Sequence, residues 1–108
     1  MKLLFLGLLA TAALAAVADK QTFTGTITDT MCADADHSQM RMGPTDAECA
    51  VACAAVHDAM YVLYDGKQAF ALSDQRTPEK LAARKVTVVG TLDAKTKTIQ
   101  VESITAAK

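Results

Sequence analysis

The sequence predicts a small protein that is mainly β, with two helices inserted between its strands. Residues 22–28 (TFTGTIT) alternate strictly between apolar or small side chains and threonines, which is the period of a half-buried strand. Residues 86–92 show the same alternation. Asp65-Gly66 separates two strand-like runs, at 59–64 and 67–72, and this dipeptide is a strong hairpin signal.

Two glycines inside the predicted strands indicate strong curvature. Gly25 and Gly90 each stand in mid-strand beside a threonine, and glycine at such a position marks a bulge or a bend, as at a barrel corner. A polar turn at 93–97 leads into a last strand that begins at Ile99. Short, strongly bent strands in so small a chain predict a five-stranded OB-like barrel, with a meander packed on one helix as the alternative.

The helices are predicted after the first and the third strand. Thr45-Asp46-Ala47-Glu48 is a capping box, and the alanine-rich stretch that follows predicts a helix to about His57. Thr77-Pro78-Glu79 opens a short helix that ends near Arg84, with Thr77 as N-cap and Pro78 in the first position.

Residues 1–18 have the pattern of a secretory signal peptide. Lys2 precedes an apolar stretch, 3–16, and Ala16-Val17-Ala18 is a cleavage pattern, with Ala13-Leu14-Ala15 as a nearby alternative. A membrane anchor is the other interpretation, but a span requires about 20 apolar residues. We therefore expect a single OB-like domain at 19–108, periplasmic or secreted, with no membrane span after cleavage.

Charge and composition exclude some partners. Without Lys2, ten basic residues stand against twelve acidic ones, and no basic run suited to a phosphate backbone is present, so we expect no nucleic-acid partner. The chain has no tryptophan and few aromatic residues, and a core this thin gains from a crosslink or a bound ion.

Every cysteine and histidine of the chain lies between residues 32 and 57, together with two methionines. The candidate metal ligands are Cys32, His37, Met40, Cys49 and Cys53. Three cysteines are an odd number, and exported proteins tend to oxidise paired thiols, so one thiol is left unpaired, bound to metal or bridged to another chain.

A disulfide is the first interpretation of this cluster. Cys49 and Cys53 are four residues apart on the predicted helix, where their Cβ vectors run parallel, so they are a poor mutual pair. Cys32 is a better partner for Cys49 or Cys53. Either bond closes a loop of about 18 to 22 residues and stabilises the fold by on the order of 3 kcal/mol.

A metal ion is the second interpretation. Three thiolates with one imidazole make a closed tetrahedral zinc site. Thioethers such as that of Met40 favour Cu(I), which makes copper slightly preferred over zinc. His57 continues the helical stripe of Cys49 and Cys53, but it equally suits a helix C-terminus as a favourable cation.

The chain lacks the sequence patterns of common catalytic sites. It has no HExxH motif and no phosphate-cradling glycine loop, and Cys49-x3-Cys53 is not the C-x-x-C redox motif. We therefore expect a protein that is not an enzyme.

The motif Met31-Cys32-x4-His37-x2-Met40, followed by Cys49-x3-Cys53, resembles a group of small exported bacterial proteins of unknown function. The resemblance covers nearly all of residues 19–108 and implies an OB-like fold and export, without an established activity. Two hypotheses follow. The first is an exported domain that binds copper or zinc through the Cys/His/Met cluster. The second is a disulfide-stabilised module, without metal, that binds another envelope protein or a small ligand.

Overall fold

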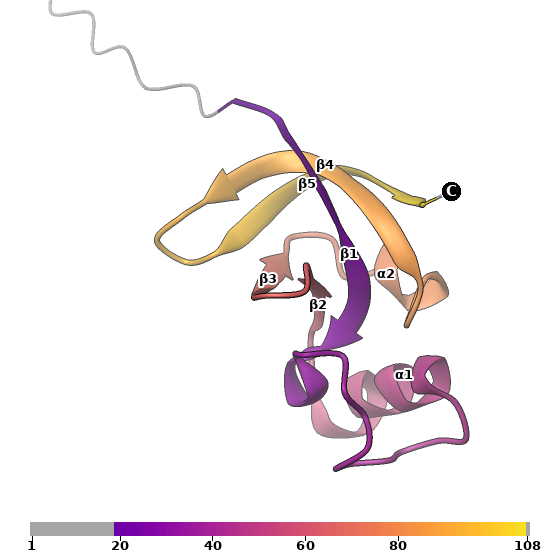
Figure 1. Ribbon diagram of the computed structural model, residues 1–108. Coiled ribbons are helices and arrows are strands. Elements are labelled where there is room, and N and C mark those ends of the chain that lie inside the picture. The colour runs from indigo at the N-terminus through magenta and orange to yellow at the C-terminus, as the bar shows by residue number, and fades with distance from the viewer. Residues whose placement is uncertain (1–18, 108) are drawn as a thin grey trace, which may run out of the picture.

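The computed structural model describes residues 19–107, so the predicted signal peptide at 1–18 lies outside the described part. Within it, five strands close into a barrel, as predicted, and their order around it is β1-β2-β3-β5-β4 (Figure 1). The strands are β1 (Gln21–Asp29), β2 (Tyr61–Tyr64), β3 (Ala69–Leu72), β4 (Lys85–Asp93) and β5 (Thr98–Ala106). No helix in residues 19–107 has the length and apolar character that a membrane crossing requires.

The long strand β1 changes partner along its length. Its first half pairs with β4 and its second half with β2, and Thr26 pairs with both. Just before this change, a Cβ atom on Gly25 would lie 2.3 Å from the Tyr64 carbonyl oxygen, so only glycine fits. In β4 the register shifts between Val89 and Gly90, which confirms the predicted irregularity there.

The barrel is closed by a short parallel seam between β3 and β5. Only Ala71 with Thr98 and Leu72 with Ile99 pair across it. The backbone N–H of Val101 also donates to the Ser73 hydroxyl over 2.8 Å, which extends the seam by one side-chain bond.

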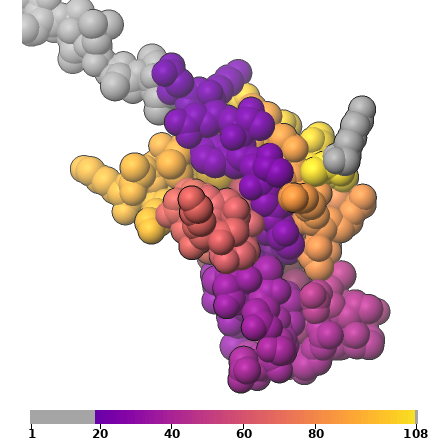
Figure 2. Space-filling view, viewed as in Figure 1, coloured from indigo at the N-terminus to yellow at the C-terminus, as the bar shows by residue number. Residues whose placement is uncertain are grey.

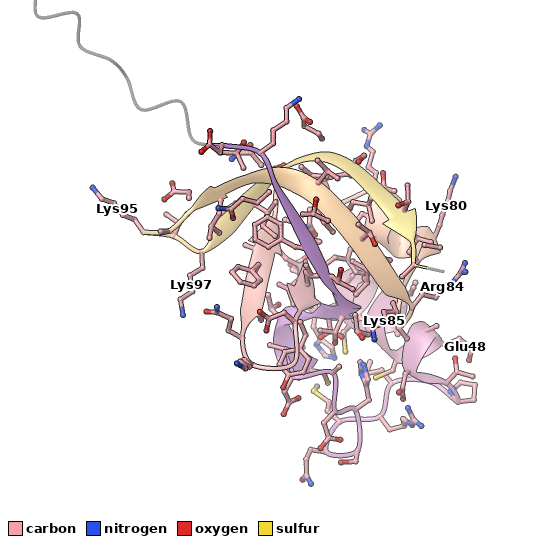
Figure 3. All side chains as sticks on the ribbon, turned by 45° about the horizontal axis from the view of Figure 1, so that its top comes forward. Glu48, Lys80, Arg84, Lys85, Lys95 and Lys97 are labelled. Carbon is pink, nitrogen blue, oxygen red and sulfur yellow. The ribbon has the colours of Figure 1, made fainter. Side chains whose placement is uncertain are left out.

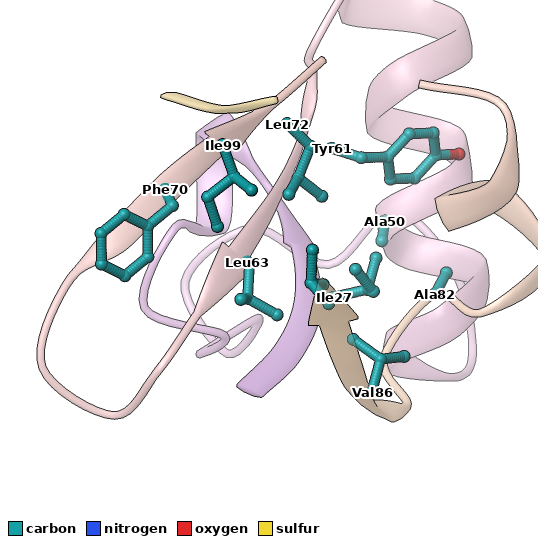
Figure 4. Packing of buried hydrophobic residues seen from close by; sticks show 10 residues of the cluster. Ile27, Ala50, Tyr61, Leu63, Phe70, Leu72, Ala82, Val86 and Ile99 are labelled. Carbon is teal, nitrogen blue, oxygen red and sulfur yellow. The ribbon is translucent and has the colours of Figure 1, made fainter. Parts of the chain in front are cut away.

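The core fills the barrel and continues to one helix. Ile27, Leu63 and Ile99 are fully buried inside the barrel, and Ala50 of the helix packs into the same cluster (Figure 4). The ring of Tyr61, at the start of β2, lies beside this helix in the close-up and links the two parts of the core.

That helix, α1 (Asp46–His57), forms where the capping box predicted it. The Thr45 side chain accepts a hydrogen bond from the Glu48 backbone N–H over 3.1 Å, which satisfies one of the free donors of the first turn. Asp58 ends the helix in the left-handed conformation, with φ 54°. Helix α1 and the chain that precedes it lie at one end of the barrel (Figures 1 and 2).

The second helix, α2 (Thr77–Lys80), differs from the prediction in two ways. It ends at Lys80 rather than near Arg84, and its N-cap is Arg76 rather than Thr77. The physical reason is Asp74, whose carboxylate accepts the backbone N–H groups of Arg76 and Thr77 and so moves the start of the turn back by one residue.

Candidate metal centre

The predicted ligands lie where the chain leaves the barrel and returns to it. After β1 the chain forms a short 3-10 turn, η1 (Thr30–Cys32), and then a loop that leads to α1. The backbone N–H of Thr30 donates to the Met60 carbonyl over 2.9 Å, which fixes this segment at its base. Sulfur atoms gather where the segment after β1 faces α1 (Figure 3).

Three of the predicted ligands converge. The thiol sulfurs of Cys32 and Cys49 and a ring nitrogen of His37 all lie within 4.8 Å of one another. The three residues are buried, with exposed fractions of 4%, 0% and 3% for Cys32, Cys49 and His37. Bonds to zinc of roughly 2.0 to 2.3 Å place neighbouring donors roughly 3.3 to 3.8 Å apart. A small inward movement of these side chains is therefore enough to hold one ion.

The hydrogen bonds of His37 leave one ring nitrogen free. Its Nε2 lies 3.5 Å from the Thr28 hydroxyl, which itself donates to the Cys32 carbonyl over 2.6 Å. Because the Thr28 proton is used in that way, the hydroxyl accepts from Nε2–H, and Nδ1 carries the lone pair. Nδ1 is buried and has no hydrogen-bond partner among the described residues. A ring fixed through one nitrogen with the other free is the usual state of a metal-ligating histidine.

The loop wraps the sulfur of Cys49. The backbone N–H of Met42 donates to Sγ over 3.3 Å, and the thiol donates to the Met40 carbonyl over 3.2 Å. Met40 meets the site through its carbonyl oxygen, and a role for its thioether stays a prediction.

Cys53 lies beside the three converging residues. It is fully buried and lies one turn after Cys49 on α1. Burial raises the pKa of Cys53 to about 11, with smaller contributions from the Asp29 carboxylate and Cys49. Burial, followed by Asp29 and Cys49, also raises the pKa of Cys32. Both thiols are therefore protonated at neutral pH in the metal-free protein, and an ion that binds Cys32 must displace its proton.

The disulfide predicted from Cys32 to Cys49 or Cys53 is not formed. All three cysteines are free thiols, and no two of them lie at bonding distance. The arrangement explains why. Cys32 and Cys49 share a centre with His37, and the Cys49 sulfur is engaged by the Met40 and Met42 backbone rather than by another thiol.

His57 lies apart from this centre. It is exposed in the last turn of α1, where a cation is favourable to the helix dipole. Of the three residues in this helical stripe, Cys49 and Cys53 are therefore buried and His57 is exposed to solvent.

Asp29 is the residue that sequence reasoning missed. The last residue of β1 is fully buried, and its Oδ1 accepts the backbone N–H groups of Met31 over 2.9 Å and Cys32 over 3.1 Å. Its other oxygen, Oδ2, is buried without a partner among residues 19–107. An aspartate directly before Thr30-Met31-Cys32 is a cap pattern for a tight turn, and this signal was available in the sequence.

A second feature of α1 is an apolar groove of about 350 Å³ that faces α2. Alanines and Val51 make up most of its lining, with Glu48, Glu79 and Lys80 also present. Few polar groups converge in this groove, so the candidate metal ligands of α1 lie on the helix face that carries Cys49 and Cys53.

Comparisons with known protein families, with curated proteins and with solved structures found no match to this chain.

Proposed function

We propose that this protein is an exported, non-enzymatic domain that binds one copper or zinc ion through Cys32, His37 and Cys49. The observation that carries the proposal is the convergence of these three buried donors within 4.8 Å, with His37 Nδ1 free of any other partner in the described chain. Two thiolates and one imidazole are a set that soft and borderline ions prefer over calcium or magnesium.

The burial of the donors favours holding an ion over catalysis with it. A catalytic zinc keeps a position open to substrate, whereas here all three donors are buried beneath the loop and α1. An ion held in this way also protects the thiols from oxidation outside the cytoplasm. The signal-peptide pattern at 1–18 and the resemblance to exported bacterial proteins support this location. A physiological partner would then be an envelope protein that delivers or receives the ion.

Metal binding to the purified, reduced protein tests the proposal. We expect about one Zn²⁺ or Cu(I) per chain by elemental analysis after dialysis. In competition with a chromophoric chelator, Cys49→Ser and His37→Gln should each weaken binding by roughly 100-fold or more, because loss of a ligand exceeds the effect of losing an outer-shell partner. His57→Gln is the matched control, because His57 is exposed at the end of the same helix and should leave the affinity unchanged. Absence of a bound ion, or equal losses in the two histidine variants, would contradict the proposal.

Alkylation without reductant separates the proposal from the disulfide-stabilised alternative. Intact mass after denaturation in an alkylating agent should show three modified cysteines in protein from which the ion has been removed. A single modified cysteine would favour the alternative. The same spectrum reports whether residues 1–18 have been removed.

A further inference from the structure

Asp29 is a buried carboxylate with half of its hydrogen-bonding capacity unused. Asp29 is fully buried, and within residues 19–107 only its Oδ1 is hydrogen-bonded. A buried ionised group without compensation is strongly unfavourable. The cation of the adjoining loop, Arg41, does not compensate it, because it pairs with Asp46 at the surface.

We propose that Asp29 is the oxygen ligand of this site: on metal binding its Oδ2 completes a four-coordinate Cys32–His37–Cys49–Asp29 set, which selects a divalent, zinc-like ion over Cu(I). This inference rests on the proposed function and names the class of ion that the site would hold.

The position of the carboxylate fits this role. Oδ1 holds the turn that carries Cys32, so the carboxylate and that thiol form one rigid unit. Neither Asp29 oxygen belongs to the group of donors within 4.8 Å of one another that Cys32, His37 and Cys49 form, so the carboxylate must turn toward this group when the ion binds. A carboxylate with one oxygen held by N–H groups and the other free is arranged to bind a metal through the free one.

The charge of the site gives the selectivity. Two thiolates and a carboxylate carry three negative charges, and the imidazole is neutral. A divalent ion leaves one uncompensated negative charge in the buried site, whereas Cu(I) leaves two, and buried net charge is unfavourable. Carboxylate oxygen is also a donor that zinc accepts and Cu(I) disfavours. For the same reason Cys53 stays a thiol, because a third thiolate would add another buried charge.

The experiment measures Zn²⁺ and Cu(I) affinities by chelator competition under anaerobic conditions, with Co²⁺ as a spectroscopic substitute for zinc. In the Asp29→Asn variant the amide oxygen can still accept the N–H groups of Met31 and Cys32, so the turn is retained while the charge and the carboxylate are lost. Asp36→Asn is the matched control. Asp36 lies in the following loop and its carboxylate also accepts a backbone N–H, from Ser38, but it is exposed. Circular dichroism melts of all variants report whether folding is retained.

We expect Asp29→Asn to weaken Zn²⁺ binding by roughly 100-fold or more, above the effect of losing an outer-shell partner, with Cu(I) binding unchanged or tighter, and Asp36→Asn to change neither. The thiolate-to-Co²⁺ charge-transfer band should correspond to two thiolates, in the wild type and in Cys53→Ser alike. Equal effects of Asp29→Asn on both ions, no effect on either, or a three-thiolate band reduced by Cys53→Ser would overturn the role of Asp29 while leaving a metal site in place. A wild-type protein that binds neither ion would overturn the proposed function itself, and the inference with it.

Discussion

Raising the pH above 9 should destabilise the metal-free protein through Cys53. The pKa of this thiol rises from 9.0 to about 11 in the folded state, mainly because the side chain is buried, with further contributions from Asp29 and Cys49. Between these two pH values the unfolded chain releases the proton while the folded protein retains it. The unfolded state then binds fewer protons, so the free energy of unfolding falls as pH rises, and the stabilising effect is fully present only below pH 9.

The magnitude follows from the size of the shift. Two pH units at 1.36 kcal/mol each give a loss of roughly 2 to 3 kcal/mol between pH 8.5 and 11.5. Urea unfolding followed by circular dichroism, with chelator and reductant present, measures the free energy at each pH. Cys32 and Tyr61 also have raised pKa values and contribute in the same range, so the informative quantity is the difference between wild type and Cys53→Ala. Wild type should lose roughly 2 to 3 kcal/mol more than the variant, and two parallel curves would refute the reasoning.

Three further predictions address the barrel, the helix and the ion. Gly25→Ala should lower the free energy of unfolding by about 2 kcal/mol or more, because the new Cβ would meet the Tyr64 carbonyl oxygen at 2.3 Å. The control Gly66→Ala lies at a turn with φ 101° and open space, and in the same urea assay its free energy of unfolding should fall by only about 1 kcal/mol. Thr45→Ala removes the N-cap of α1 and should lower the free energy of unfolding by about 1 kcal/mol, and an unchanged thermal melt would contradict the cap's role. Zinc at 100 times its dissociation constant should add about 2.7 kcal/mol and raise Tm by roughly 10 to 20 °C, and a similar rise in His37→Gln would argue against the site.

Local signals explain why most of the fold was predictable. Alternation in β1 and β4 and the Asp65-Gly66 turn depend on neighbouring residues only, and so does the Thr45 cap of α1. The start of β5 was predicted and its end was not, because its second half is largely exposed; Glu102, for example, pairs with Lys20 at the surface. Such residues carry no apolar alternation, and the strand is fixed there by its pairing with β4.

The site was predictable in its residue types and not in its arrangement. The motif indicated Cys32, His37 and Cys49 together, and the structure brings these three into one group. The burial of Asp29 and Thr28 depends on α1 and the loop covering the end of β1, and a sequence pattern assigns such polar residues to the surface. The structure does not support the disulfide interpretation, and the sequence could not decide it, because compartment and residue count do not determine where the three cysteine side chains point.

The base of the segment between β1 and β2 has a consequence for how this protein can vary. Thr30 and Met60 are joined twice, by the Thr30 N–H to the Met60 carbonyl and by the Met60 N–H to the Thr30 hydroxyl, so the chain leaves and re-enters the barrel at neighbouring points. The residues between them can change in length or sequence without shifting the pairing of Asp29 with Tyr61 just below. The segment is in this sense an insert: a barrel that joins the same two strands by a tight turn would keep its register. A barrel that carries the insert would gain Cys32, His37 and Cys49, but its first strand would also have to supply Thr28 and Asp29.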